Sequence, residues 1–239
     1  MACLLATVPL MGQGGTMDGG NRMNAMGGRG SAEAFFVDLT TFDFGRILPV
    51  PPEPGSLAER ADLETVLRIQ ARRTPADVEW AGTVIKGDVF SSSDVVGNRF
   101  KKESLPATAE LFRKLDADAA AVNNGAKAVF KRDRPFTVSA DVIPCVAKPA
   151  GYCYPSTYAV EVFVRAGVLA ELFPEKRAEL SRQAHDHAWA RVVGGVHFPT
   201  DVIAGRLLAE RILADALKTP VLRAELEKVR AEISLRAGK

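Results

Sequence analysis

Arg191, His197 and Asp201 place a guanidinium, an imidazole and a carboxylate within eleven residues of a 239-residue chain. Asp201 follows His197 by four positions, so its carboxylate can accept a hydrogen bond from one ring nitrogen and leave the other nitrogen with a lone pair facing a cavity. Arg191 offers a planar fork of donors that suits a carboxylate or a phosphate. Taken alone, the stretch is equally compatible with a histidine satisfied between two helices beside an Arg–Asp surface pair.

A second group of cations lies earlier in the chain, where six residues separate Lys127 from Arg134 and Pro135 follows. On a continuous helix the two cations would fall near one face, two turns apart. We expect Pro135 to end that helix and Arg134 to point into the space that the next loop encloses. Lys131 and Arg132 are as readily explained as solvated side chains. A basic cluster at a helix end is usually a solvated face that complements the helix dipole, which is the simpler interpretation of this cluster alone.

A third stretch, residues 154–158, reads Tyr-Pro-Ser-Thr-Tyr and opens an apolar helix expected over 159–173. Ser156 is a natural N-cap, and the free N–H groups at a helix start form a site for anions. Capping alone would also explain the serine.

Pro199 predicts where the helices on either side of His197 begin and end. Pro199 suits the first turn of a helix, because its missing N–H would have no intrahelical partner there. His197 is therefore expected in the connection just before that helix, and Asp201 in its first turn. A preceding helix over 175–193 leads into this connection, and the new helix extends to about residue 217.

Helix starts upstream are marked by the same signals. Ser56 and Thr74, the latter followed by proline, each predict an N-cap, and we expect the second helix to continue to about Val89. An alanine-rich segment over 105–130 has helical spacing, with a break expected near Asn123–Gly125. No segment alternates in the way that a half-buried strand would, so we predict an all-α fold.

The predicted domain, a single helical bundle, covers residues 32–239. Residues 1–31 are rich in Gly, Met and Asn after a short apolar start, and we interpret them as a flexible leader or a signal-peptide remnant; a start-site artefact is the alternative. Cys145 and Cys153 either close a short loop as a disulfide in an oxidising compartment or remain free thiols.

The composition excludes two kinds of partner. A hydrophobic content of 47% can build a substantial core, and 31 basic against 29 acidic residues leave a net charge of +2. No basic stripe with interleaved aromatics is present, so nucleic acid is not expected as a partner. No apolar window reaches about 18 residues, which excludes a membrane-spanning helix.

The three stretches in order resemble the phosphatidic acid phosphatase type 2 (PAP2) superfamily: Lys, six residues, Arg-Pro; then Pro-Ser at a helix start; then Arg, five residues, His, three residues, Asp. The sequence of residues 191–201 and the proline-rich segment at 48–54 most resemble those of the class A bacterial non-specific acid phosphatases. The resemblance implies an all-helical fold, a periplasmic or secreted location, homo-oligomers, no required metal or other cofactor, and a phosphomonoester or inorganic phosphate as partner. It also implies an architecture shared with vanadium haloperoxidases, whose vanadate occupies the phosphate position.

The same resemblance implies a role for each matched residue. His197 matches the nucleophile that takes the phosphoryl group, and Asp201 matches the carboxylate that orients it. Ser156 matches a hydroxyl donor to phosphate. Phosphoryl transfer needs in-line placement and positive charge around the equatorial oxygens, which three cations and a helix N-terminus can supply. The cations that match the phosphate clamp are Lys127, Arg134 and Arg191.

Two departures from the family pattern fall in the second motif, where Pro-Ser-Gly-His is replaced by residues ending in Thr157 and Tyr158. The family histidine acts first as general acid and then as base. Tyr158, with an ordinary pKa of about 10, is a possible proton donor but a poor base at acidic pH. Loss of such a group typically costs ~10²–10⁴ in rate. Thr157 adds a β-branched side chain where the family brings backbone close to phosphate, which predicts a narrowed or reshaped pocket.

Three residues could stand in for the missing histidine. Glu161 lies one turn after Tyr158, and His185 and His187 lie on the helix expected over 175–193, which precedes His197. Paired histidines on a polar helix face are more often exposed, and metal binding by them is less expected still. Our leading hypothesis is a phosphohydrolase that is slow or selective for good leaving groups. The alternative is a catalytically impaired relative that binds phosphate or another oxyanion. A haloperoxidase ranks third, and a lipid phosphatase is disfavoured because the membrane helices of those relatives are absent.

Overall fold

The computed structural model describes residues 34–237, and every regular element in this range is a helix. The predicted all-α fold is therefore confirmed for these residues, whereas the predicted leader lies outside them. None of the helices between residues 34 and 237 is long and apolar enough to cross a membrane. The elements are η1 (Leu39–Thr41), α1 (Phe44–Ile47), α2 (Leu57–Arg72), α3 (Pro75–Val84), η2 (Val89–Ser92), α4 (Ser93–Val96), η3 (Lys102–Ser104), α5 (Pro106–Phe130), α6 (Pro135–Val138), α7 (Thr157–Leu172), η4 (Pro174–Lys176), α8 (Arg177–Val193), α9 (Pro199–Ala216) and α10 (Pro220–Ala237).

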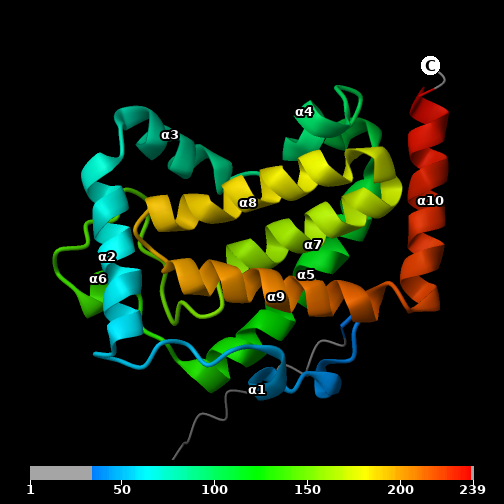
Figure 1. The fold of residues 1–239 in the computed structure, drawn as a ribbon. Helices are drawn as coiled ribbons and strands as arrows, with labels where there is room; N and C mark the ends of the chain where they lie inside the picture. Colours follow the sequence, from blue (N-terminus) through cyan, green and yellow to red (C-terminus); the bar gives the residue numbers. More distant parts are fainter. Residues whose placement is uncertain (1–33, 238–239) are drawn as a thin grey trace, which may run out of the picture. The chain divides into compact units, whose positions relative to one another are not determined.

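Helix α7 is the centre of the bundle. It packs against α5, α8 and α9, and in Figure 1 it runs between α8 and α9 with α5 behind it. The sequence accounts for this position, because a helix enclosed by others must be apolar around most of its circumference. The buried residues of α7 are Ala159, Val160, Val162, Phe163, Val164, Val168, Leu169 and Ala170.

A glycine sets how closely α9 approaches the start of α7. A Cβ atom on Gly205 would lie 2.7 Å from Ala159 Cβ and 2.9 Å from the carbonyl oxygen of Ser156. No side chain fits there, so glycine lets the two backbones meet. One turn earlier on α9, the carbonyl of Asp201 accepts a hydrogen bond from the Ser156 N–H at 3.0 Å. Two of the predicted site stretches are thereby joined.

The helix starts follow the predicted capping. Ser56 Oγ accepts from Glu59 N at 3.1 Å, and Thr74 forms a capping box with Asp77 ahead of Pro75. Pro199 occupies the first turn of α9, as its missing N–H predicts.

Two helix boundaries differ from the sequence prediction. Helix α5 continues through Asn123–Gly125 without a break. Gly125 is needed there for packing, because a Cβ atom at this position would lie 2.9 Å from the ring of Phe44. Helix α3 ends at Val84 instead of continuing to Val89.

The prediction that one helix carries Lys127 and Arg134 is also wrong. Helix α5 ends at Phe130, and Lys131 adopts a left-handed conformation with φ 49°. Pro135 therefore begins the short helix α6 instead of ending α5. Arg134 lies in the turn between them, where its direction is set by contacts far away in the sequence.

Candidate active site

His197 and Asp201 form a buried pair in the turn from α8 to α9. His197 Nδ1 lies 3.2 Å from Asp201 Oδ2, and the same oxygen accepts from the Phe198 N–H at 2.9 Å. Gly195 has φ +73°, the left-handed backbone that this turn requires, and packs against Pro144. His197 is only 3% exposed, so its ring is held on both sides by protein atoms.

Arg134 fixes the other nitrogen of the His197 ring. Its Nη1 atom lies 3.2 Å from His197 Nε2 and donates to the Val196 carbonyl at 3.0 Å. Its remaining nitrogens donate to the carbonyls of the loop 150–152. Because a guanidinium only donates, Nε2 is the accepting nitrogen and Nδ1 carries the proton toward Asp201. The lone pair of Nε2 therefore lies on the side of the cations.

Burial, more than the surrounding charges, keeps the imidazole neutral. Burial lowers the pKa of His197 to about 4, with Arg134 and Lys127 acting in the same direction and Asp201 opposing them. Burial acts to raise the pKa of Asp201, but hydrogen bonds from His197 and Phe198 and the charge of Arg132 leave it below its ordinary value. A neutral imidazole beside an ionised carboxylate is the state that a nitrogen nucleophile needs.

Arg191 lies near the end of α8 and is 7% exposed. Its Nε and Nη1 atoms are buried and have no hydrogen-bond partner among residues 34–237. Burial, and then the charge of Arg134, lower the pKa of this guanidinium. Buried donors without acceptors are costly, and a bound oxyanion is an acceptor of the kind that these donors lack.

Lys127 and the start of α7 complete the basic side of the site. Lys127 Nζ donates to the Tyr152 carbonyl, and burial, followed by the charge of Arg134, lowers its pKa to about 8. Ser156 is fully buried and caps α7, accepting from Ala159 N at 3.4 Å. The Thr157 hydroxyl accepts from Asn123 Nδ2 at 2.7 Å, so this side chain is tied to α5.

Tyr158, which stands where the family resemblance leads us to expect a histidine, is bound to the end of α3. Its hydroxyl donates to the Val84 carbonyl at 2.6 Å, at the end of α3. Burial raises its pKa to about 12, and the Arg191 guanidinium carbon lies 5.9 Å from the ring centroid. The hydroxyl is therefore neutral across the acidic and neutral range and is already committed to a carbonyl.

The three possible substitutes lie around Tyr158 at different depths. His185 is exposed and pairs with Arg206 at 3.0 Å. His187 is half-buried, which lowers its pKa, and with Tyr158 it lines a small cavity of about 20 Å³ between α7, α8 and residues 87–92. Burial raises the pKa of Glu161. Among the three, His187 is the one that shares a cavity with Tyr158.

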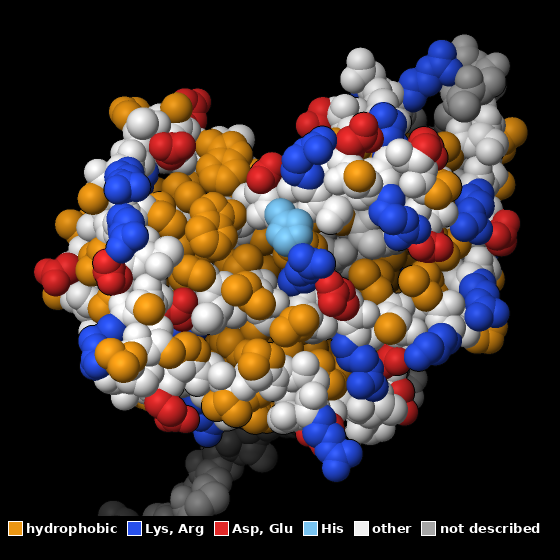
Figure 2. Space-filling model, viewed as in Figure 1, with side chains coloured by type: hydrophobic (Ala, Val, Ile, Leu, Met, Phe, Trp, Pro, Cys, Tyr) orange, Lys and Arg blue, Asp and Glu red, His pale blue; other side chains and the backbone are white. Residues whose placement is uncertain are grey.

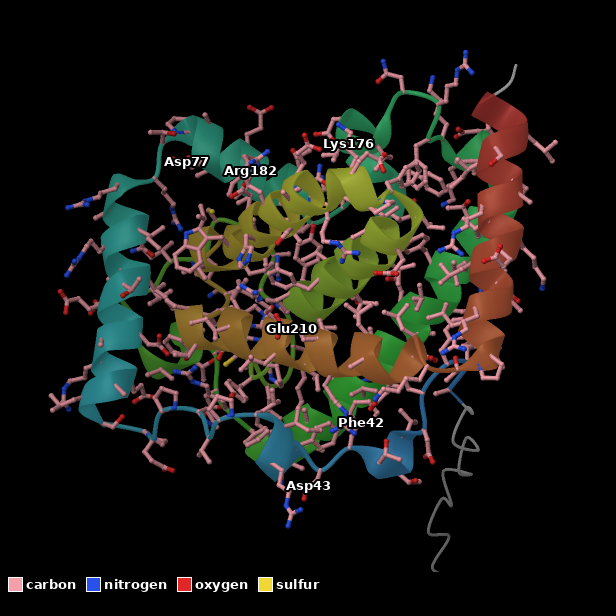
Figure 3. The ribbon with its side chains drawn as sticks, turned by 45° about the vertical axis from the view of Figure 1, so that its right-hand side comes forward. Phe42, Asp43, Asp77, Lys176, Arg182 and Glu210 are labelled. Carbon is pink, nitrogen blue, oxygen red and sulfur yellow. The ribbon has the colours of Figure 1, made fainter. Side chains whose placement is uncertain are left out.

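His187 also borders a second, more polar hollow between α3, α4 and α8. The hollow opens as the notch in the upper edge of Figure 2. Figure 3 shows Lys176 and Arg182, which line it, along the side of α8 that faces α3 and α4.

Arg132 and Asp62 are site residues that sequence reasoning missed. A solvated side chain is one explanation of Arg132 from the sequence, but the structure shows it 6% exposed, with donation to Asp201 Oδ1 at 2.7 Å and to Asp62 Oδ2 at 2.8 Å. One signal was available for Asp62: it lies one turn before Val66 on the same face of α2, and both are buried.

The two cysteines of the domain are free thiols, which resolves the alternative left open by their spacing. Cys153 is buried and its Sγ donates to the Asp133 carbonyl at 2.9 Å. Cys145 is half-buried, near the Val193 carbonyl. Within residues 34–237, no cluster of three or more His, Cys, Asp and Glu side chains could hold a metal ion.

Comparison with known proteins shows what this chain is similar to. The sequence profile of the PAP2 superfamily matches residues 117–220, from within α5 to the first residue of α10. It is 27% identical over 199 residues to a non-specific acid phosphatase from Providencia stuartii, with 79% of each chain covered. It is 28% identical over 198 residues to a non-specific acid phosphatase from Salmonella typhimurium, with 78% of each chain covered.

A solved structure shares the fold. A transmembrane PAP2-type phosphatidylglycerolphosphate phosphatase from Bacillus subtilis superposes with a TM-score of 0.51 and 20% identity, covering 73% of this chain and 89% of that one. The likeness extends to the helical architecture alone.

Proposed function

We propose that this protein is a phosphomonoester hydrolase in which His197 carries the phosphoryl group as a phosphohistidine. The observation that carries the proposal is the His197 ring, whose Nδ1 faces Asp201 while its Nε2 lone pair faces Arg134. The match to the PAP2 superfamily profile and the similarity to bacterial non-specific acid phosphatases support the same reaction class.

Substrate phosphate would bind between the cations and the start of α7. Arg191 offers two buried nitrogens without partners among the described residues, and Lys127 adds a charge beside Arg134. The backbone N–H groups at the start of α7, next to Ser156, complete an anion site without a metal ion.

The reaction proceeds in two displacements. His197 Nε2 attacks phosphorus, the P–N bond forms, and the ester P–O bond breaks with its electron pair leaving on the alkoxide or phenoxide. The negative charge of Asp201 stabilises the positive charge that develops on the ring. Water then attacks phosphorus, the P–N bond breaks, and inorganic phosphate and neutral His197 are regenerated.

The proton transfers are the weak part of this site. The leaving group needs a proton and the attacking water must lose one, but the Tyr158 hydroxyl is committed to the Val84 carbonyl and has a pKa near 12. We therefore expect turnover to be slow and to favour leaving groups that depart without protonation, such as phenolates.

The test is p-nitrophenyl phosphate turnover at pH 5–7 by the native chain and by His197→Ala and Tyr158→His variants. Native turnover above the His197→Ala blank, with acid-labile phosphate trapped on His197 after rapid quenching, supports the proposal. Turnover that survives His197→Ala would show that another group is the nucleophile.

A second function is favoured by one observation, the Tyr158 hydroxyl bound to a carbonyl. With no mobile acid or base at this position, the site could bind phosphate or another oxyanion without turnover. Micromolar phosphate affinity in calorimetry, together with native turnover equal to the His197→Ala blank, would establish this alternative.

We also propose a periplasmic or secreted location and a homo-oligomeric state, in keeping with the likeness to the bacterial acid phosphatases. Cell fractionation and light scattering of the purified chain test these two points. Recovery in the cytoplasmic fraction, or a monomeric mass, would contradict them.

A further inference from the structure

Arg132 connects two helices behind the proposed nucleophile. Its Nη2 atom donates to Asp62 on α2, and its Nη1 atom donates to Thr200 Oγ1 and Asp201 Oδ1 on α9, each at 2.7 Å. Thr200 Oγ1 in turn donates to the same Asp62 oxygen. The guanidinium thus joins residues that are about 70 positions away from it on either side of the sequence.

The orientation of Arg132 is fixed as well as its contacts. The ring of Phe198 lies against the guanidinium, with its centroid 4.0 Å from Cζ, a stacking arrangement that favours one plane. The side chains of Arg132, Asp62 and Asp201 are at most 6% exposed. Water therefore cannot replace a lost partner easily, and each carboxylate depends on the arginine for its neutralising charge.

The two carboxylate oxygens of Asp201 accept hydrogen bonds from different donors. Oδ1 accepts from Arg132, whereas Oδ2 accepts from the Phe198 N–H and from His197 Nδ1. Arg132 donates to the oxygen of this carboxylate that His197 does not use, so the plane in which Oδ2 meets the imidazole depends on Arg132.

We propose that Arg132, anchored by Asp62, is a positioning residue that fixes the Asp201 carboxylate and thereby the tautomer and direction of His197. The inference rests on the proposed function, because it concerns the residue that we propose as nucleophile. Arg132 has no hydrogen bond to His197 itself, in contrast to Arg134, and acts only through Asp201.

A positioning role predicts a particular kinetic pattern. The phosphate-facing groups Lys127 and Arg191 do not contact Arg132, so substrate affinity should survive its replacement. We expect kcat to fall about 10-fold for Arg132→Lys, which keeps the charge but cannot reach Asp62 and Asp201 together, and about 100-fold for Arg132→Gln. KM and the dissociation constant of inorganic phosphate should stay within about twofold of native.

The matched control is Arg206→Lys, which alters an exposed arginine on α9, the helix that carries Asp201; Arg206 pairs with Glu210 at 2.8 Å. It should leave kcat unchanged. Asp62→Asn tests the anchor: it retains the contact of Arg132 with Asp201 and should lower kcat about 10-fold. If Arg132→Gln fails to fold, the Arg132→Lys and Asp62→Asn variants still test the inference.

A readout that does not need turnover is available because the chain contains three histidines. Two-bond ¹H–¹⁵N spectra at pH 7, assigned with His197→Ala, report which nitrogen of His197 carries the proton. We expect Nδ1–H alone in the native chain and in Arg206→Lys, and a mixture of tautomers in Arg132→Gln and Asp62→Asn.

The groups that act on the His197 ring in these spectra are Asp201, Arg134 and Lys127. An unchanged His197 tautomer in folded Arg132 and Asp62 variants would overturn the inference, as would a loss of kcat matched by an equal loss of phosphate affinity. If native turnover equals that of His197→Ala, the proposed function fails, and the spectra still decide the role of Arg132.

Discussion

Arg132 and Arg191 are both withdrawn almost completely from solvent, but they differ in how much of the guanidinium is paired. Arg132 donates through both Nη atoms to two carboxylates and a threonine and stacks on Phe198, and its Nε atom alone is buried without a partner among the described residues. Arg191 keeps two buried nitrogens without partners among the described residues. Hydrogen bonding therefore distinguishes an arginine that is paired within the protein from one that we propose binds a ligand. Burial alone does not distinguish them.

The largest expected effect lies on the ligand side of this comparison. His197→Ala should lower turnover of p-nitrophenyl phosphate by about 10⁴-fold or more, because it removes the nitrogen that we propose to form the covalent intermediate. Arg191→Met should lower kcat/KM by about 10³-fold through lost charge stabilisation. Steady-state kinetics measure both, and a loss below tenfold for Arg191→Met would remove this residue from the site.

The sharpest contrast between the two arginines concerns stability. Arg132→Met leaves two buried carboxylates unpaired and should lower the free energy of unfolding by about 3–5 kcal/mol. Arg191→Met removes donors that lack partners and should change it by less than about 1 kcal/mol, while abolishing stabilisation by added phosphate. Urea unfolding with and without phosphate measures these values. Equal losses for the two variants would break the comparison.

A smaller effect is expected where the site departs from its relatives. Tyr158→His should raise turnover of an alkyl phosphate by about 10²-fold and that of an aryl phosphate by less, because a phenolate needs little protonation to leave. Initial rates on the two substrate classes measure the ratio. Equal gains on both would show that Tyr158 limits something other than proton transfer.

The smallest expected effect is a pH dependence of phosphate binding from Lys127, whose folded pKa is lowered to about 8 by burial and by Arg134. Lys127 is charged below that pH and loses its charge above it, so phosphate affinity should fall several-fold from pH 7 to pH 9. Lys127→Gln is the comparator and should bind more weakly at pH 7, with a flatter profile. Parallel profiles for the two chains would assign the dependence to another group.

Local signals in the sequence predicted the parts of this molecule that neighbouring residues determine. Ser56, Thr74 and Pro199 each start a helix where their capping chemistry indicates. The spacing of His197 and Asp201 likewise brings their side chains within 3.2 Å.

Contacts between distant segments were not predictable in the same way. Gly125 sits inside α5 because Phe44 packs on it, although its local signal favoured a break. Arg132 is paired with Asp62 and Asp201, about 70 residues away on either side, so nothing next to it in sequence distinguishes it from solvated Lys131. The orientation of the Tyr158 hydroxyl toward Val84 also required the fold.

Gly205 determines how closely α9 can approach the start of α7. The start of α7 and the first turn of α9 keep their relative position because the two helices are in close contact at Gly205. A single methyl group would not fit, since a Cβ atom on Gly205 would lie 2.7 Å from Ala159 Cβ. The helix end that we propose to bind the anion and the proposed nucleophile are therefore aligned by the close approach of two helices, and a substitution at Gly205 would change catalysis without altering any reacting group.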